Sequence, residues 1–292
     1  MTLAFIGLGN MGGPMAANLA KAGLAPRGFD VVPMLRETAA GAGLTIAASS
    51  AEAARNADVI VTMLPAGKHV LDVWREVLGV AKPGALIVDC STIDVASARA
   101  AHALAEGAGL LALDAPVSGG TAGAQAGTLT FMCGGSDAAF AAARPVLEKM
   151  GKKLVHCGGA GAGQAAKICN NMILGATMIA TCEAFVLAEK LGLSHQALFD
   201  VASTSSGQSW SLSSYCPVPG PVPASPANRD YKPGFAAALM LKDLTLAQEA
   251  ARASGAATPL GAHAAEIYAR FNAAGHAGDD FSGVIRWLRQ NE

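Results

Sequence analysis

Near its start the chain reads Leu3-Ala-Phe-Ile-Gly-Leu-Gly-Asn-Met-Gly12, a short apolar run that leads directly into the pattern Gly-x-Gly-x-x-Gly. A helical repeat of apolar residues follows and ends near Gly23, and a second strand is predicted over 27–29, which Asp30 closes. The glycine pattern by itself is weak evidence. Strand, glycines, helix, strand and acid in this order are typical of a Rossmann unit that binds a dinucleotide.

Each glycine of the pattern has a physical role in such a unit. Gly7 permits the tight turn, Gly9 lets the backbone approach a pyrophosphate, and Gly12 lets the helix close on the sheet. The start of the helix supplies free N–H groups and a partial positive charge for the phosphates. The turn as a whole, with Asn10 and Met11, is therefore predicted to bind the cofactor.

Asp30 lies where an acid is expected to bond the hydroxyls of the adenine ribose. A cofactor with a 2′-phosphate would meet a charge of the same sign there, and no arginine occurs in the following Val31-Val32-Pro33. The sequence thus favours NAD over NADP. The alternative is an ordinary aspartate at the end of a strand.

Two further apolar runs, 58–65 and 85–89, have the continuous hydrophobicity of parallel strands that are buried on both faces. Ligands of open α/β sheets bind beyond the carboxyl ends of the strands. Leu64 and Pro65 at the end of the first run, and Thr92 after the second, are therefore predicted to line the cofactor site. Proline or Ser-Thr after a strand is also ordinary turn chemistry.

A further predicted strand, 110–114, is followed by Ala115-Pro-Val-Ser-Gly-Gly120. Ser118, Gly119 and Gly120 would expose a hydroxyl and backbone N–H groups that could hold a carboxylate. A plain flexible loop would have a similar sequence. Short strands at 128–133 and 152–156 complete the predicted sheet.

Beyond Gly163 the strand signals stop and helical periods take over. A chain of 292 residues is long for one core. We therefore predict an α/β Rossmann domain with a parallel-rich sheet over residues 1–160 and an all-α domain for substrate binding and oligomerisation over residues 161–292. The predicted helices of the second domain span residues 163–191, 194–204, 234–254, 258–274 and about 280–290.

Lys167 stands in Gly161-Ala-Gly-Gln-Ala-Ala-Lys-Ile-Cys-Asn-Asn171, at the start of a helical stretch that is apolar on nearly every face. A helix that is apolar all round is expected to be buried, and a desolvated lysine gives up its proton more easily. Such a lysine can exchange a proton with a substrate hydroxyl near neutral pH. Asn171 projects from the same face one turn later. The alternative is a lysine that snorkels to solvent at a helix start.

The segment Tyr215–Pro226 contains five prolines, which stiffen it at a low entropic cost. Long ordered loops of this kind are usually lids or binding loops; a disordered linker is the alternative. Lys242-Asp243 begins a later apolar helical stretch, and such a pair usually lies on a solvated helix face.

The composition argues against several classes of function. The net charge of −1 leaves no electrostatic footprint for nucleic acid or an anionic membrane. The six cysteines include no C-x-x-C pair and, with the six histidines, show no metal-ligand spacing, so we predict no metal. The apolar composition, at 52% hydrophobic residues, favours a soluble oligomer. The first strand begins almost at once, so we expect no signal peptide and a cytoplasmic protein.

Four motifs together resemble the β-hydroxyacid dehydrogenase family over essentially the whole chain. They are Gly7-Leu-Gly-Asn-Met-Gly-Gly-Pro-Met-Ala-Ala-Asn-Leu19, Asp114-Ala-Pro-Val-Ser-Gly-Gly120, Gly161-Ala-Gly-Gln-Ala-Ala-Lys-Ile-Cys-Asn-Asn-Met172 and Lys242-Asp-Leu-Thr-Leu-Ala247. Ser205-Ser-Gly-Gln-Ser-Trp210, with Tyr215 after it, resembles the 3-hydroxyisobutyrate branch more than the tartronate-semialdehyde branch. Cys216 departs from the asparagine that the branch would place there.

The resemblance implies that a long helix joins the two domains, that Lys167 is the catalytic lysine, and that Asn171 is its helper. It also implies a site for the substrate and the nicotinamide end of the cofactor. The residues that it assigns to this site are Ser118, Gly119 and Gly120 for the substrate carboxylate, Thr92 and Lys242 for substrate and cofactor, Asp243 beside them, and Trp210 and Tyr215 in the substrate wall.

The implied reaction is the NAD-dependent, reversible oxidation of the primary alcohol of a short β-hydroxy carboxylate, with 3-hydroxyisobutyrate from valine breakdown as the expected substrate. L-Serine and tartronate semialdehyde are alternatives within the family, and a homodimer or homotetramer is expected. In a different class, the chain could be a non-catalytic NAD-binding scaffold. The joint presence of Lys167, Asn171 and Ser118 argues against a scaffold.

Overall fold

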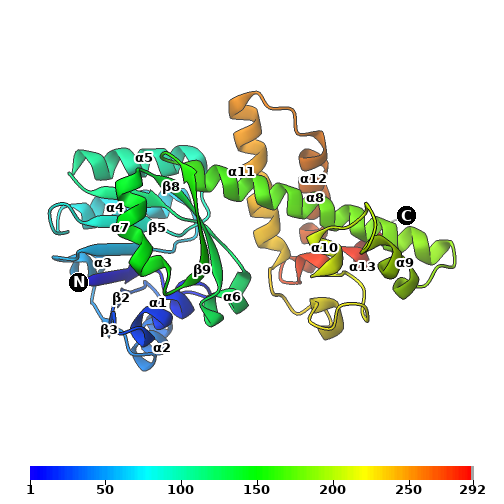
Figure 1. Ribbon diagram of the computed structural model, residues 1–292, viewed down its shortest axis with the longest axis horizontal. Helices are drawn as coiled ribbons and strands as arrows, with labels where there is room; N and C mark the ends of the chain where they lie inside the picture. Colours follow the sequence, from blue (N-terminus) through cyan, green and yellow to red (C-terminus); the bar gives the residue numbers. More distant parts are fainter. Residues whose placement is uncertain (291–292) are drawn as a thin grey trace. The chain divides into compact units, whose positions relative to one another are not determined.

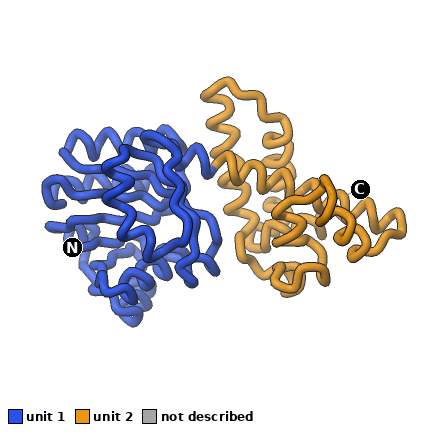
Figure 2. The backbone as a smooth tube through the Cα atoms, viewed as in Figure 1, with its two compact units in different colours: residues 1–167 blue, residues 168–292 orange. Residues whose placement is uncertain are grey.

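The structure is a computed structural model that describes residues 1–290. The chain divides into two compact units, one over Met1–Lys167 and a second that begins at Ile168 (Figure 2). We call them the N-terminal unit and the C-terminal unit. The predicted division of binding functions at residues 160 and 161 stays a prediction.

The N-terminal unit contains a sheet in the strand order β3-β2-β1-β4-β5-β6-β8-β7, with β9 beside β8 (Figure 1). The pairs from β3 to β6 are parallel, β8 is antiparallel to β6 and β7, and β9 is parallel to β8. The predicted parallel-rich Rossmann sheet is thus confirmed. The strands are β1 Leu3–Ile6, β2 Arg27–Phe29, β3 Thr45–Ile46, β4 Val59–Thr62, β5 Leu86–Asp89, β6 Leu111–Asp114, β7 Val117–Ser118, β8 Leu129–Gly135 and β9 Gly151–Gly158.

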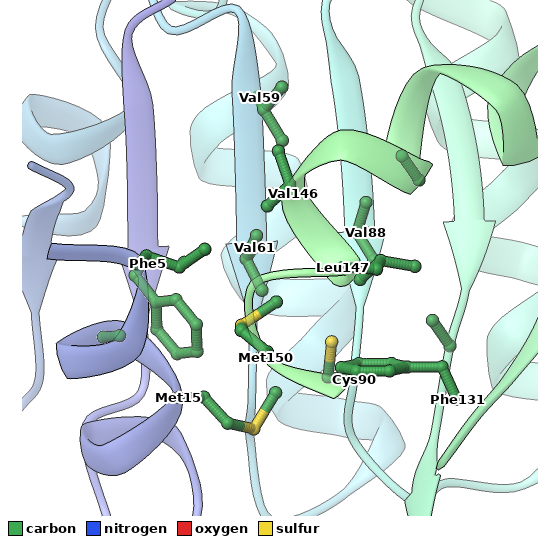
Figure 3. Close-up of a cluster of buried hydrophobic side chains, with 14 of the residues drawn as sticks. Phe5, Met15, Val59, Val61, Val88, Cys90, Phe131, Val146, Leu147 and Met150 are labelled. Carbon is green, nitrogen blue, oxygen red and sulfur yellow. The ribbon is translucent and has the colours of Figure 1, made fainter. Parts of the chain in front are cut away.

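Helices cover both faces of this sheet, as the alternation of buried side chains along the strands requires. In β1, Leu3 and Phe5 belong to one apolar cluster, which Figure 3 shows in part, whereas Ala4 and Ile6 belong to a second cluster. The helices of the first cluster are α1 Gly12–Lys21, α2 Pro33–Gly41, α6 Gly120–Ala126 and α7 Asp137–Leu147. Those of the second are α3 Ser50–Ala54, α4 Gly67–Leu78 and α5 Val95–Gly107.

Polar residues end three neighbouring parallel strands at the same level. Thr62 of β4 pairs in register with Asp89 of β5, and Asp89 pairs with Asp114 of β6. All three side chains are buried. This polar edge lies at the carboxyl ends of the strands, where open α/β sheets bind their ligands.

The C-terminal unit is helical, as predicted. Its helix α8, Ala162–Lys190, begins within the N-terminal unit and supplies Met178 and Phe185 to the helical core. The other elements are α9 His195–Ala202, α10 Trp210–Ser213, α11 Ala237–Ser254, α12 Pro259–Phe271, α13 Val284–Leu288, the 3-10 turns Pro226–Arg229 and Phe281–Gly283, and the π turn Asn272–His276.

The structure corrects two expectations about helices. The stretch around α8 was expected to be buried on every face, but Ile173 and Leu187 are 63% and 59% exposed, so the helix has one buried and one open face. Among the described residues, α8 is long and apolar enough to cross a membrane. The core helix of a soluble protein meets the same two criteria, so this is weak evidence for a membrane span. The last predicted helix is divided into Phe281–Gly283 and α13, because Asp280 caps the short turn by accepting a hydrogen bond from the Ser282 N–H group.

Candidate active site

The glycine turn after β1 has the geometry of a phosphate cradle. Gly7 has a φ of +93°, and a Cβ atom there would lie 2.1 Å from the Met63 carbonyl oxygen. A Cβ atom on Gly12 would lie 1.9 Å from the carbonyl oxygen of Gly7, whereas one on Gly9 would meet nothing within 4 Å. Gly7 and Gly12 are therefore required by packing, while Gly9 leaves open the space that a pyrophosphate needs. Asn10 is exposed beside it and Met11 is half-buried.

Asp30 is held against this turn by both of its carboxylate oxygens. Oδ2 accepts a hydrogen bond from the Leu8 N–H group at 2.7 Å, and Oδ1 accepts one from the Val32 N–H group at 2.8 Å. The carboxylate is half-buried. It lies at the carboxyl end of β2, beside the glycine turn, which is the location that ribose recognition requires.

Arg36 of α2 is a neighbour of Asp30 that sequence reasoning missed. Its Nη1 donates to the Asp30 carbonyl oxygen at 2.6 Å and to the Val31 carbonyl oxygen at 3.3 Å, and its guanidinium lies over the Phe29 ring. Sequence reasoning considered only the residues directly after Asp30. Arg36 lies in the first turns of α2, and the helix places its guanidinium, a cation, beside Asp30.

The loops after β4 and β5 are joined to each other through Ser91. Its hydroxyl accepts a hydrogen bond from the Leu64 N–H group at 2.7 Å and donates one to Asp89 Oδ1 at 2.6 Å. Thr62 Oγ1 donates to the same Asp89 oxygen at 2.7 Å. The two loops that contain Leu64, Pro65 and Thr92 are thereby fixed in one arrangement. Thr92 is half-buried and Pro65 is exposed.

Asp89 is a buried acid that sequence reasoning did not single out. Within the described part of the chain its Oδ2 atom has no hydrogen-bond partner. Burial raises the pKa of the Asp89 carboxyl to about 6, although hydrogen bonds from Ser91 and Thr62 oppose this change. The cost of desolvating the charged form outweighs the donors that stabilise it.

The first turn of α8 is tied to the polar edge of the sheet. Asp114 accepts hydrogen bonds from the N–H groups of Gly161 at 2.8 Å and Gln164 at 2.9 Å, and it contacts His102 Nε2 at 3.0 Å. The Gln164 side chain accepts from the Ile93 N–H group at 3.1 Å and donates to the Ser91 carbonyl oxygen at 2.7 Å. These contacts lie within the N-terminal unit.

Lys167 lies three residues after Gln164 in α8 and is 7% exposed. The burial of this lysine is thus as predicted. Asn171, one helical turn further along α8, is 2% exposed. Its Nδ2 donates to Asp243 Oδ2 at 2.5 Å, and its Oδ1 accepts from Asn170 Nδ2 at 2.9 Å. The orientation of the Asn171 amide is therefore set by its neighbours.

Asp243 does not lie on a solvated helix face, which was the alternative for the Lys-Asp pair. It is 4% exposed and belongs to the buried face of α11, while Lys242 is half-buried. The contact between Asn171 and Asp243 joins α8 to α11 inside the C-terminal unit. Two of the predicted site residues are thus brought together.

Ser118, Gly119 and Gly120 lie at a junction between two short elements and not in a plain loop. Ser118 ends β7, which pairs with β8, and α6 begins at Gly120. Gly119 and Gly120 have φ values of +135° and +60°, which favour glycine. The short β7 was missed because two paired residues give too little alternation to read, and α6 was missed because its sequence is rich in glycine and alanine.

Trp210 and Tyr215 form a stacked pair in the C-terminal unit, with ring centroids 4.9 Å apart. Trp210 is 52% exposed, whereas the Tyr215 hydroxyl donates to Asp280 Oδ2 at 2.8 Å. Burial and the Asp280 carboxylate raise the pKa of Tyr215 above its ordinary range. Asp280, a second buried acid that sequence reasoning missed, holds the stacked pair in place.

The proline-rich loop is anchored at both ends. Cys216 and Ser225 are buried, and the Ser225 hydroxyl donates to the Cys216 carbonyl oxygen at 2.5 Å. The Tyr231 hydroxyl donates to the Pro217 carbonyl oxygen at 2.8 Å. The loop is an ordered part of the helical unit, and the cysteine that replaces the expected asparagine packs into its core.

Comparisons with known proteins agree with this geometry. The model of the NAD-binding domain of 6-phosphogluconate dehydrogenase matches residues 2–159, and that of the NAD-binding segment of NADP-dependent 3-hydroxyisobutyrate dehydrogenase matches residues 161–288. A probable 3-hydroxyisobutyrate dehydrogenase of Mycobacterium tuberculosis is 58% identical over 99% of this chain and 98% of its own. The chain belongs to the β-hydroxyacid dehydrogenase family.

A solved structure and a second relative extend this comparison. A solved structure of the Mycobacterium tuberculosis 3-hydroxyisobutyrate dehydrogenase with L-serine has a TM-score of 0.96 and 58% identity, and the match covers 99% of each chain. An NAD-dependent L-serine dehydrogenase of Pseudomonas aeruginosa is 49% identical over 97% of this chain and 96% of its own. The family and the fold inferred from the motifs are confirmed, and the chain is a nicotinamide-dinucleotide oxidoreductase.

The segments that are expected to bind the dinucleotide lie at one edge of the sheet. The cradle at Gly9, the carboxylate of Asp30 and the joined loops at Leu64 and Thr92 all lie at the carboxyl ends of β1, β2, β4 and β5. The described residues contain no group of three or more His, Cys, Asp or Glu side chains arranged to hold a metal ion.

Proposed function

We propose that this chain is an NAD-dependent 3-hydroxyisobutyrate dehydrogenase, which oxidises the primary alcohol of its substrate to the semialdehyde. The observation that carries the proposal is the buried side chain of Lys167 on α8, one turn before Asn171, in a chain that is 58% identical to relatives of that name. A lysine side chain that is held in place in this way can act as a general acid–base group toward a substrate hydroxyl.

Residues of the N-terminal unit would hold the pyrophosphate and the adenine ribose of the dinucleotide. The turn over Gly7, Gly9 and Gly12 receives the pyrophosphate, and Asp30 accepts hydrogen bonds from the ribose hydroxyls. The loops at Leu64-Pro65 and Thr92 would line the rest of the cofactor. The bound dinucleotide supplies a hydride acceptor for the carbinol hydrogen.

Lys167 would accept the proton of the substrate hydroxyl during oxidation and return it during reduction of the aldehyde. Asn171 would help to place the reacting hydroxyl, since its amide is already oriented by Asp243 and Asn170. General acid–base help of this kind is typically worth about 10²–10⁴-fold. Ser118, Gly119 and Gly120 would bind the carboxylate of the substrate.

The preference for 3-hydroxyisobutyrate rests on the character of the substrate wall. Trp210 and Tyr215 present aromatic surface, which suits the methyl group of this substrate. L-Serine has an ammonium in place of the methyl, and burying that charge is unfavourable unless an acid or an indole face compensates. Lys242 would lie beside the substrate and the cofactor.

L-Serine is the second candidate, and one observation favours it. Asp243 is a buried carboxylate next to Asn171, and it could offset an ammonium that approaches the same side chain. The Pseudomonas aeruginosa relative is named for L-serine. Tartronate semialdehyde reduction is a weaker alternative, since the segment Ser205–Trp210 resembles the 3-hydroxyisobutyrate branch more than the tartronate-semialdehyde branch.

NAD is proposed as the preferred cofactor because the Asp30 carboxylate would repel a 2′-phosphate. The Arg36 guanidinium beside Asp30 weakens this repulsion, so we expect discrimination against NADP to be incomplete. We also propose a cytoplasmic homo-oligomer in branched-chain amino acid breakdown, without a nucleic-acid or membrane partner. The exposed apolar residues Ile173, Leu187 and Leu191 on or beside α8 support self-association.

The proposal is tested by initial rates of NAD reduction with 3-hydroxyisobutyrate, L-serine and 3-hydroxypropionate under the same conditions. We expect the highest kcat/KM for 3-hydroxyisobutyrate. 3-Hydroxypropionate controls for the methyl group, because it keeps the carboxylate and the carbinol. A higher kcat/KM for L-serine would transfer the chain to the second candidate, and no turnover of any β-hydroxy acid would contradict both.

A further inference from the structure

The amino-terminal turn of α8 is held more tightly than a helix start needs to be. Asp114 acts as its cap from a distant strand, because it accepts the N–H groups of Gly161 and Gln164. A carboxylate at this end of a helix is also favoured by the helix dipole. His102, which is 4% exposed, contacts the same carboxylate and limits its orientation.

A second set of contacts ties the same turn to the loop after β5. The Gln164 side chain is fully buried and bonds the Ser91 carbonyl oxygen and the Ile93 N–H group, one on each side of Thr92. An amide that uses its donor and its acceptor in this way fixes both the distance and the angle between two segments. Lys167 lies one turn after Gly163 and Gln164 in the same helix.

Close packing removes any remaining freedom. A Cβ atom on Gly163 would lie 2.2 Å from the Met132 carbonyl oxygen and 2.7 Å from that of Asp114. From the side of β8, a Cβ atom on Gly134 would lie 2.6 Å from the Gly163 nitrogen. The helix therefore touches the backbones of β6 and β8 directly.

We propose that Asp114 and Gln164 are positioning residues that set the place of the Lys167 amine relative to Thr92. The inference rests on the proposed role of Lys167 in proton transfer. Neither residue contacts the reacting atoms; each acts through the first turn of α8. A misplacement of about 1 Å at a reacting group can cost about a hundredfold in rate, so a clamp of this kind has a measurable effect on turnover.

The test uses Gln164→Met, Asp114→Asn and Gly163→Ala, with Gly159→Ala as the matched control. A Cβ atom on Gly159 would meet nothing within 4 Å, so this control adds the same methyl group just before the helix without a collision. We expect Gln164→Met and Asp114→Asn to keep their fold by circular dichroism, and Gly163→Ala to fold with a lower thermal midpoint because its methyl group meets two backbone carbonyl oxygens. Each clamp variant that folds should lose at least about tenfold in kcat. The KM for NAD should change far less, and Gly159→Ala should turn over like the unmodified protein.

A double-mutant cycle separates positioning from a general structural effect. In a Lys167→Ala background, the further change Gln164→Met should lower the residual kcat less than about twofold, because the group that it positions is gone. An equal loss in both backgrounds, an unaltered kcat in Gln164→Met, an equal loss in Gly159→Ala, or failure of all three clamp variants to fold would each overturn the proposal. If Lys167→Ala alone kept near-native turnover, the proposed function would fail separately.

Discussion

At the scale of single residues, the structure repeatedly shows a charged group whose neighbours set what it can do. Asp30 has both oxygens engaged by backbone N–H groups and has Arg36 beside its carbonyl oxygen. Asp89 has one oxygen with several donors and one buried oxygen without a partner among the described residues. We expect the first carboxylate to affect the choice between NAD and NADP, and the second to make the stability of the protein depend on pH.

For cofactor choice, we expect Asp30→Ala to lower the ratio of kcat/KM with NAD to kcat/KM with NADP by at least about tenfold. The change removes a ribose hydrogen bond and the repulsion of a 2′-phosphate, each of which is worth roughly 1 kcal/mol or more. In the double variant Asp30→Ala/Arg36→Ala, activity with NADP should fall again. Higher kcat/KM of the unmodified protein with NADP than with NAD would contradict the assignment of Asp30 to the ribose hydroxyls.

For the pH response, the sign follows from the raised pKa of Asp89. The folded state holds the proton more tightly than the unfolded chain does, so this group's contribution to stability is present below about pH 4 and is lost as the pH rises through about 6. Its charged form costs the folded state about 3 kcal/mol at neutral pH.

Asp89→Asn should therefore raise the thermal midpoint at pH 8 and leave it nearly unchanged at pH 4, because asparagine resembles the protonated acid. Thr62→Val, which removes one donor to the charged form, is the matched comparison and should have the opposite sign at pH 8. A shift in midpoint that is the same at both pH values would refute the account of Asp89.

At the scale of elements, the glycine turn separates what packing requires from what ligand binding requires. Gly7 lies in a left-handed conformation against the Met63 carbonyl oxygen, whereas the space beside Gly9 is open. Two alanine substitutions in the same turn should therefore affect different properties, the stability of the fold in one case and the affinity for NAD in the other. Gly7→Ala should destabilise the folded protein, because a non-glycine residue is strained there and collides with backbone.

Gly9→Ala should instead fold with an unchanged thermal midpoint and bind NAD at least about tenfold more weakly, since its methyl group fills the space for the pyrophosphate. The measurements are thermal denaturation and NAD titration of both variants. Unchanged NAD affinity in Gly9→Ala would contradict the assignment of this turn as the cradle.

The elements also show what a single sequence can and cannot predict. The parallel strands were found because each is an apolar run with a distinct end, and the order of strand, glycines and acid placed Asp30 correctly at the end of β2. Contacts between distant segments were not predictable. The hydrogen bonds from the start of α8 to Asp114, and from Arg36 to the Asp30 carbonyl oxygen, form only once the chain has folded. No local pattern records such pairs.

The open face of α8 illustrates the same limit. Its composition predicted burial on all sides, but composition does not say how many neighbours a helix has, and α8 leaves Ile173 and Leu187 exposed. The resemblance of four motifs supplied what periodicity did not, namely the family and the roles expected of Lys167 and Asn171. The roles of these two residues, and those of the other predicted site residues, stay predictions.

At the scale of the whole molecule, a dinucleotide-binding unit and a helical unit share α8, which carries Lys167 at the end of the first unit and Asn171 near the start of the second. The first unit contains the glycine turn, Asp30 and the loops after β4 and β5, and the second unit contains Asp243 and the stacked pair of Trp210 and Tyr215. We propose that the amine of Lys167 on this helix moves the proton, while the first unit holds the cofactor independently of that amine.

Lys167→Ala tests this requirement most directly, through kcat with 3-hydroxyisobutyrate and the affinity for NAD measured on the same preparation. Alanine suits a helix interior, and Lys190→Ala at the far end of α8 is the control for losing a lysine from this helix. We expect Lys167→Ala to bind NAD with unchanged affinity and to lose at least about a hundredfold in kcat, whereas Lys190→Ala should keep both values. A Lys167→Ala protein that binds NAD and keeps near-native kcat would contradict the proposal.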